Sequence, residues 1–152
     1  MNSSNLSLPD IEPGLGVQLA AAIEAMPASR LVGLRVLGFA PGGRSVLELP
    51  IAPQVTFDGR RVQGGIVGLL ADYAGVSAAN VTLGPGWAAS TTSFEVHHLA
   101  PAQGDRLVAV GEALQVGKTH AVSTVRVWAL SGDQATLVAV GTTTCRPYQL
   151  KN

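Results

Sequence analysis

The sequence predicts an α+β domain in which an antiparallel sheet wraps around one long, apolar helix. Residues 64–80 are rich in Gly, Ala and Leu and contain no proline, which favours a helix that is apolar on nearly all sides and therefore buried. Four later segments are rich in Val, Thr and Ala and are separated by short turn signals: residues 87–99, 105–116, 119–130 and 134–146. Such a succession predicts an antiparallel meander. A sheet curled around the helix is the simplest way to bury both of its faces.

The N-terminal third extends this prediction. Residues 1–14 are mostly polar or proline-containing, so we expect a flexible N-terminal arm before a single domain of residues 15–152. The apolar positions within residues 15–28 recur near the helical period and predict a short amphipathic helix. Residues 30–40 and 44–50 flank a Pro-Gly-Gly turn and predict a β-hairpin.

Composition and charge exclude several classes of partner. Of the 152 residues 47% are hydrophobic and only 13% are charged, so we expect apolar surface to be hidden in a homo-oligomer, a dimer or a dimer of dimers. The net charge is zero, which gives the chain no overall field for nucleic acid or an anionic membrane. The uncharged stretches are broken by Gly, Pro, Ser and Asn, which argues against a membrane span. With one cysteine, Cys145, and no secretory signal at the N-terminus, we expect a cytoplasmic protein.

Asp72 is the one charged residue between residues 62 and 80. A carboxylate among apolar and small side chains is costly unless it is paired, protonated or used in a reaction. It follows Gly64-Gly65 by about two helical turns, so a candidate acid or base lies downstream of candidate backbone donors. The alternative is a structural acid that accepts hydrogen bonds from the backbone or from Tyr73, with glycines that only allow close helix packing.

Two segments carry a resemblance to a known family. Residues 63–72, QGGIVGLLAD, resemble the [His/Gln]-Gly-Gly-x(6)-[Asp/Glu] signature of hotdog-fold acyl-CoA thioesterases, especially the phenylacetate-pathway (PaaI-like) branch. Residues 91–102, TTSFEVHHLAPA, resemble that family's strand in which Thr or Ser precedes alternating apolar residues and a terminal Pro-Ala. The resemblance covers about residues 30–146. It implies a hotdog fold and hydrolysis of an acyl-CoA without metal or cofactor, coenzyme A being part of the substrate.

The resemblance also assigns catalytic roles. The Gly64 amide, at a helix N-terminus, polarises the thioester carbonyl and stabilises the developing oxyanion. Gln63 donates a hydrogen bond to the same carbonyl or holds the loop. Asp72 serves the site that the Gly-Gly turn of another subunit completes, and it either attacks the thioester carbon or activates a water. Thr91 positions the water or the acid, with Thr92 as the adjacent alternative.

Further residues are expected to bind substrate. Gly65 belongs to the same turn as Gly64. Phe57 stands where relatives often have Asn or Gln, so either Thr56 or Asp58 supplies the missing polar group or the pocket is more apolar than usual. Three cations are either solvated loop charges or candidates for coenzyme A phosphate contacts: Arg60, Arg61 and Lys118. Five apolar or aromatic side chains favour an aromatic or medium-chain acyl group: Phe57, Ile66, Leu69, Tyr73 and Trp87.

Two other functions remain open. Phe57 in place of a polar residue favours a non-catalytic protein that binds acyl-CoA or a small ligand on the same fold. A hotdog hydratase or dehydratase would need a His–Asp or His–Glu pair, for which His97 or His98 would have to approach Asp72 in space. Consecutive strand histidines point to opposite faces and cannot share one ion, and no Cys or Glu lies at ligand spacing, so we expect no metal.

Overall fold

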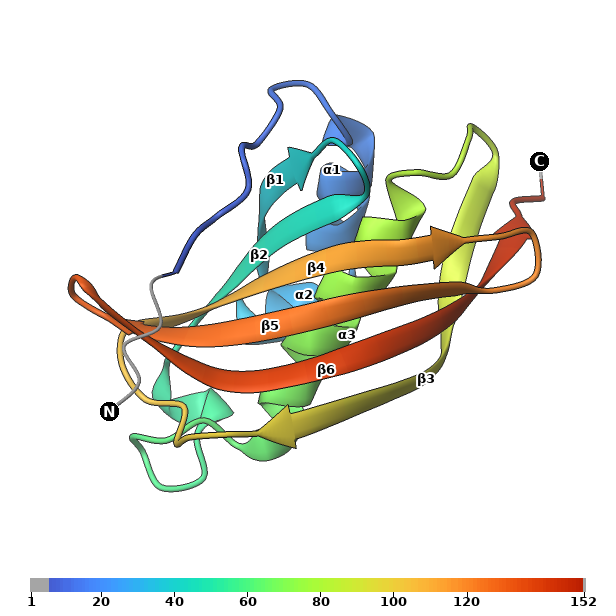
Figure 1. The fold of residues 1–152 in the computed structure, drawn as a ribbon. Helices are drawn as coiled ribbons and strands as arrows, with labels where there is room; N and C mark the ends of the chain where they lie inside the picture. The colour runs from blue at the N-terminus through green and yellow to red at the C-terminus, as the bar shows by residue number, and fades with distance from the viewer. Residues whose placement is uncertain (1–5, 152) are drawn as a thin grey trace.

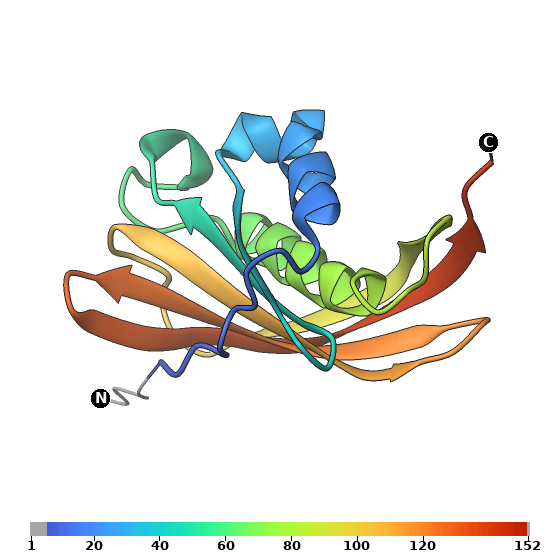
Figure 2. The same cartoon turned by 90° about the horizontal axis from the view of Figure 1, so that it is seen from above.

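One six-stranded antiparallel sheet carries the helices on its concave side, as the computed structural model, which describes residues 6–151, shows in Figures 1 and 2. The strand order is β1-β2-β4-β5-β6-β3. The helices are α1 (Val17–Ala25), α2 (Pro27–Val32) and α3 (Gly64–Asn80), with a 3-10 turn at Pro53–Val55. The strands are β1 (Arg35–Ala40), β2 (Arg44–Pro50), β3 (Trp87–His98), β4 (Arg106–Val116), β5 (Ala121–Ser131) and β6 (Gln134–Gln149). The α+β architecture with a long central helix and an N-terminal helix is thereby confirmed.

The predicted hairpin is formed by β1 and β2. Gly42 and Gly43 have φ of 82° and 71°, in the left-handed region that suits a tight turn between twisted strands. The hairpin starts later than the sequence predicts, because residues 30–32 belong to α2 and not to a strand. Gly33 ends α2 with φ of 74°, and β1 begins two residues later.

The single helix predicted over residues 15–28 is two short helices. Met26 is extended and separates α1 from α2, and Pro27 occupies the first position of α2. Proline lacks the N–H that a helix interior needs but fits the first turn, so the chain restarts a helix there instead of continuing one.

The C-terminal strands form a meander only in part. β4, β5 and β6 pair in sequence, but β3 does not pair with β4. Instead β3 pairs with β6 at the far edge of the sheet, and β4 pairs with β2. The prediction of a four-strand meander is therefore wrong for β3, since α3 and β3 together carry the chain from one side of the sheet to the other (Figure 1).

α3 packs closely on the middle of the sheet. The hydroxyl of Ser45 on β2 donates to the carbonyl of Ala74 at 2.6 Å. Gly111 on β4 faces the same carbonyl, and a Cβ at Gly111 would collide with it. A Cβ at Gly75 would likewise collide with Thr143 on β6. Small residues on both elements thus let the backbone of α3 approach the strands closely.

The opposite side of α3 is only partly covered in the single chain. We call it the open face, and it consists of Ile66, Leu69, Asp72, Tyr73 and Val76, all half-buried. The α1–α2 junction reaches its edge, where the Tyr73 hydroxyl lies 3.6 Å from the Met26 sulfur. α3 is therefore buried on the side toward the sheet, as predicted, and half-buried on the open face, because the sheet curls around one side of the helix only.

The segment before α1 runs along the sheet without helix or strand. The Glu12 amide donates to the carbonyl of Phe39 on β1 at 2.9 Å, and Leu6 packs against an apolar cluster on the convex face that includes Val108 and Trp128. Residues 1–5 of the predicted arm lie outside the described residues, and the flexibility of the arm stays a prediction. No helix within residues 6–151 is long and apolar enough to cross a membrane.

Candidate active site

The start of α3 leaves one backbone donor free. The chain enters the helix through Gln63, whose side-chain oxygen accepts a hydrogen bond from the Gly65 amide at 2.6 Å. The Gly64 amide has no partner among residues 6–151. The contact of Gln63 with the Gly65 amide fits the predicted role in which Gln63 holds the loop, and the role of Gln63 as a donor to the carbonyl stays a prediction. The free amide of Gly64 remains available to an oxygen of a ligand.

Asp72 lies in the middle of the open face, two turns further along α3. The Thr91 hydroxyl on β3 donates to its carboxylate at 2.8 Å. Partial burial raises the pKa of Asp72 above its usual value, and the hydrogen bond from Thr91 lowers the pKa in part. No cation pairs with Asp72 within residues 6–151. Its carboxylate is oriented but not neutralised.

A β-bulge in β3 decides which threonine faces the acid. The pairing with β6 shifts by one residue between Thr91 and Ser93, so that Thr91 lies opposite Cys145 on the inner face of the sheet. Thr92 is the extra residue, and its hydroxyl donates to the carbonyl of Thr144 at 3.1 Å. The structure therefore brings Thr91 to Asp72 and assigns Thr92 a contact within the sheet.

Cys145 lies close to the candidate acid. Its thiol is buried, with 1% of the residue exposed. Burial raises the pKa of the Cys145 thiol, and the negative charge of Asp72 raises it further. The thiol is thus kept protonated, which is the opposite of what a nucleophilic cysteine requires.

The two halves of the predicted site do not meet in one chain. Gly64 and Asp72 are eight residues apart on one helix, which separates them by about 12 Å at the helical rise. A single thioester carbonyl cannot contact both.

The loop before α3 folds back on itself and exposes Phe57 to solvent. Thr56 bridges to Val62 across the loop. The Asp58 carboxylate accepts hydrogen bonds from the Arg61 amide and side chain, both at 2.7 Å, and these contacts lower the pKa of Asp58 to about 2. The Arg61 guanidinium lies 5.2 Å from the centre of the Phe57 ring, which is 62% exposed.

Thr56 and Asp58 are the two residues expected to replace the Asn or Gln that relatives often have at the position of Phe57. The Thr56 hydroxyl donates to the carbonyl of Pro53 and accepts from the amide of Gly59. Asp58 is engaged by Arg61. Both side chains are therefore committed within the loop, and neither is free to face a ligand.

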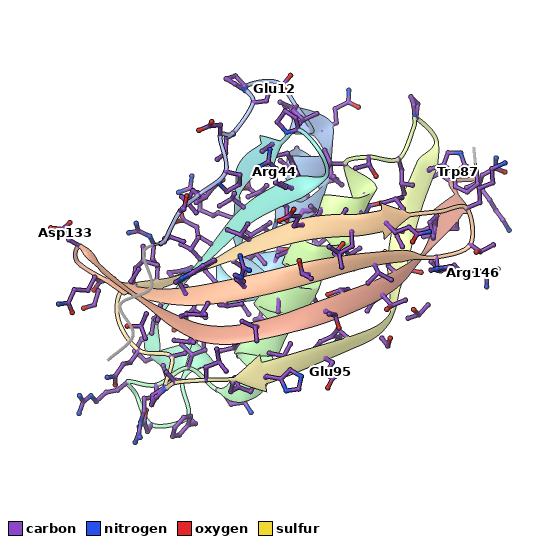
Figure 3. All side chains as sticks on the ribbon, in the orientation of Figure 1. Glu12, Arg44, Trp87, Glu95, Asp133 and Arg146 are labelled. Atoms are coloured by element: carbon purple, nitrogen blue, oxygen red, sulfur yellow. The ribbon has the colours of Figure 1, made fainter. Side chains whose placement is uncertain are left out.

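The three candidate cations lie in two separate places, with Arg60 and Arg61 on the loop before α3 and Lys118 beyond the other end of the helix. Arg60 lines a cleft of about 640 Å³ beside the loops that follow β2 and β3. Lys118 lines an apolar cleft of about 600 Å³ with Trp87 and Leu114, at the other end of α3. Figure 3 shows Trp87 at this far end of the sheet, well away from Glu95 on β3. Within one chain these cations do not converge.

One residue beside Gly64 was not predicted to belong to the site. A Cβ at Gly64 would lie 3.5 Å from His98 Nε2. β3 ends at His98 directly beside the start of α3 (Figure 1). Residues of β3 from Phe94 onward alternate regularly, so the pattern alone places His98 on the same face as Phe94. The sequence pattern did not predict that β3 pairs with β6, and this pairing turns the face with Phe94 and His98 toward α3.

Metal ligation finds no support in the described chain. Among residues 6–151 no three His, Cys, Asp or Glu side chains come together as a metal ion would require. The expectation of no metal stays a prediction.

Comparison with known proteins assigns the family. The sequence model of the thioesterase superfamily matches residues 61–136, which is half of the chain and includes Gly64, Asp72 and Thr91. The chain belongs to the thioesterase superfamily. This thioester hydrolase matches no curated protein.

Solved structures show the same hotdog fold. A thioesterase family protein from Silicibacter pomeroyi is 26% identical to this thioesterase, with a TM-score of 0.83 over 90% of this chain and 99% of that one. The E. coli PaaI protein, from the phenylacetic acid degradation operon, is 22% identical, with a TM-score of 0.72 over 86% and 92% of the two chains. A phenylacetic acid degradation-related protein from Ralstonia eutropha is 21% identical, with a TM-score of 0.73 over 87% and 98%. These structures confirm the hotdog fold that the resemblance implies.

Proposed function

We propose that this thioesterase hydrolyses an acyl-CoA with an aromatic or medium-chain acyl group to the free acid and coenzyme A. Asp72 acts as the nucleophile or as the general base for water, and the Gly64 amide polarises the carbonyl. The observation that carries the proposal is the 2.8 Å hydrogen bond from Thr91 to Asp72 on the open face of α3. A half-buried carboxylate with a raised pKa, oriented by one hydrogen bond and lacking an ion pair in the described chain, is suited to chemistry more than to stability.

A second copy of the chain completes this site. An attacked carbonyl carbon lies about 3 Å from its nucleophile, and the carbonyl oxygen lies about 3 Å from its donor. The separation of about 12 Å between Gly64 and Asp72 along one helix is too large for that. Two α3 helices that pack antiparallel through their open faces would bring Gly64 of one copy to Asp72 of the other. The two-fold symmetry of such a dimer gives two equivalent sites.

The exposed edge of β3 supports this mode of association. β3 pairs with β6 along one edge only, and its other edge is free within residues 6–151. A twelve-residue free edge is a template for pairing with another strand. Phe94, on the inner face of β3, is 48% exposed and packs over Gly68 of α3. Pairing of β3 with β3 of a second copy would cover both this ring and the open face.

The open face also supports an apolar acyl group. Ile66, Leu69 and Tyr73 flank Asp72 along one side of α3. In the proposed dimer these side chains surround the carbonyl and shield it from bulk water, which strengthens the interactions that stabilise the oxyanion. A short polar acyl group would gain nothing from such a lining.

Coenzyme A enters only as part of the substrate, and its phosphates would meet cations of both copies. In an antiparallel pair the start of one α3 lies toward the end of the other. Arg60 and Arg61 of one copy then face the same region as Lys118 and Trp87 of the second copy. The proposed reaction uses no metal and no other cofactor, and a reducing, cytoplasmic setting suits the single buried Cys145.

The proposal is tested by mixing two inactive variants. Asp72→Asn and Gly64→Val each remove one half of the site, so each homodimer should release almost no thiol from octanoyl-CoA or phenylacetyl-CoA. A mixed dimer has one site with both halves intact and one with both altered. After unfolding and refolding an equal mixture, we expect about one quarter of wild-type activity. The control is the same treatment of each variant alone.

The outcomes separate the alternatives. No recovery in a mixture that contains mixed dimers contradicts a shared site. Wild-type protein that binds acyl-CoA without releasing thiol is instead a binding protein, the function that the exposed Phe57 favours. Hydration of an enoyl-CoA without thiol release would indicate the hydratase, although neither His97 nor His98 hydrogen-bonds to Asp72 within the described chain.

A further inference from the structure

We infer that His98 is a catalytic residue of this thioesterase, whose imidazole donates a second hydrogen bond to the thioester carbonyl oxygen beside the Gly64 amide. The inference rests on the proposed function and adds to it a side-chain donor from β3, in place of the polar residue that the loop before α3 lacks.

The position of His98 follows from strand register. His98 pairs with Ala139 of β6, and Ala139 belongs to the core that faces α3. The His98 side chain therefore lies on the α3 side of the sheet, at the end of β3 nearest the helix start. Its Nε2 and Cε1 atoms lie 3.5 and 3.6 Å from the point where a Cβ of Gly64 would be. The imidazole and the Gly64 amide thus border the same space.

His98 is free to act there. Its side chain is exposed, and its ring makes no hydrogen bond within residues 6–151. The neighbouring His97 differs, because its Nε2 lies 3.1 Å from Glu95 on the convex face. Thr56 and Asp58, the polar side chains of the preceding loop, are engaged within that loop. Of Thr56, Asp58 and His98, only His98 makes no hydrogen bond within residues 6–151.

The chemistry needs a donor and no proton transfer from His98. When Asp72 of the second copy, or the water it activates, adds to the carbonyl carbon, the C=O π electrons move onto oxygen. The negative charge is then held between the Gly64 N–H and the imidazole N–H. The C–S bond breaks as the oxygen returns its electrons, and the thiolate of coenzyme A leaves. On the water route Asp72 takes the proton of the water and the free acid forms directly, and on the nucleophilic route water then hydrolyses the anhydride formed on Asp72. His98 keeps its proton throughout, so a side chain that only donates can replace it.

The experiment compares His98→Leu, His98→Gln and the matched control His97→Leu on octanoyl-CoA and phenylacetyl-CoA. Loss of one oxyanion donor lowers kcat by about 100-fold, so we expect His98→Leu to lose roughly that factor with KM changed little. His98→Gln keeps an N–H donor and should recover most of the loss. His97→Leu should match the wild type, because His97 lies on the other face. Thermal unfolding of each variant shows that the fold is intact.

Two results would overturn the inference. One is a His98→Leu enzyme as active as His97→Leu. The other is a rise in KM with kcat unchanged, which would make His98 a uniform binding contact. If the wild type releases no thiol, the proposed function fails, and the contact of His98 with the carbonyl is then tested by the affinity for two substrate analogues. His98→Leu should weaken binding of a coenzyme A ketone analogue but leave binding of a thioether lacking the carbonyl unchanged, and equal loss for both would contradict a carbonyl contact.

Discussion

Along α3, the face toward the sheet and the open face differ in what their residues contact. On the sheet side, Gly75 lies against Thr143 and Ala74 against Gly111 and Ser45, with no space for a further atom. At the helix start, a Cβ at Gly64 would meet only the His98 ring, at ordinary contact distance. The same residue type, glycine, therefore serves packing at one position and access at the other. A carboxylate is tolerated on the open face because that face is not closed by the chain's own sheet.

Gly75→Ala should give the largest effect and should act on stability alone. The added methyl group would collide with Thr143 and lie 3.1 Å from Val125 Cγ2. Overpacking of this kind costs about 1–3 kcal/mol, and the collision with two atoms of Thr143 places Gly75 at the upper end, against a gain of about 1 kcal/mol in helix propensity. We expect a net loss of about 2 kcal/mol in the free energy of urea unfolding. Activity per folded molecule should stay near that of the wild type; an unchanged unfolding midpoint would show that the sheet side is looser than the structure indicates.

Gly64→Ala makes the same chemical change about three turns earlier on α3 and should act on activity alone. The methyl group fits without a clash, so the unfolding free energy should change by less than about 0.5 kcal/mol. It would occupy the space between the helix start and His98, where the carbonyl is proposed to bind. We expect kcat/KM for octanoyl-CoA to fall about tenfold, equal to about 1.4 kcal/mol. A stable variant with full activity would remove Gly64 from the site.

Thr91→Val should give the smallest effect, which appears in the pH profile. The reaction requires Asp72 as a carboxylate, so activity should rise as pH rises through the pKa of Asp72. The hydrogen bond from Thr91 lowers that pKa, and its removal lets burial raise the pKa further. The acidic limb of kcat/KM should therefore move to higher pH. Thr92→Val is the matched control, and an equal shift in both variants would contradict the pairing of Thr91 with Asp72.

The sequence was sufficient for the parts of the fold that depend on local pattern. The long apolar run of residues 64–80 became α3 with the predicted bounds, and the strand segments became β3 to β6. The placement of β3 beyond β6 could not be predicted, because strand order depends on which edges remain free after β2 pairs with β4. Pro27 is the residue that indicates the break between α1 and α2, because proline fits the first turn of a helix and not its interior.

The candidate site also contains residues that the sequence predicts and residues that become evident only from the placement of the strands. Asp72 stood out because its charge conflicts with its neighbours, and Gly64 because of its spacing from Asp72. His98 gave no such signal, since an exposed histidine at a strand end is unremarkable until the strand is placed beside α3. The choice between Thr91 and Thr92 depended on a register shift that has no signature in residue type.

The extra residue at Thr92 also affects how relatives of this chain can be compared. Side chains of a strand alternate between its faces, so one inserted position exchanges the two faces for everything that precedes it. Two chains with Thr or Ser in the same aligned column can therefore direct those hydroxyl groups to opposite sides of the sheet. The hydroxyl group that contacts the acid is identified by counting residues from the β-bulge in each chain's β3. A gap-free alignment of β3 can hide the position of this bulge.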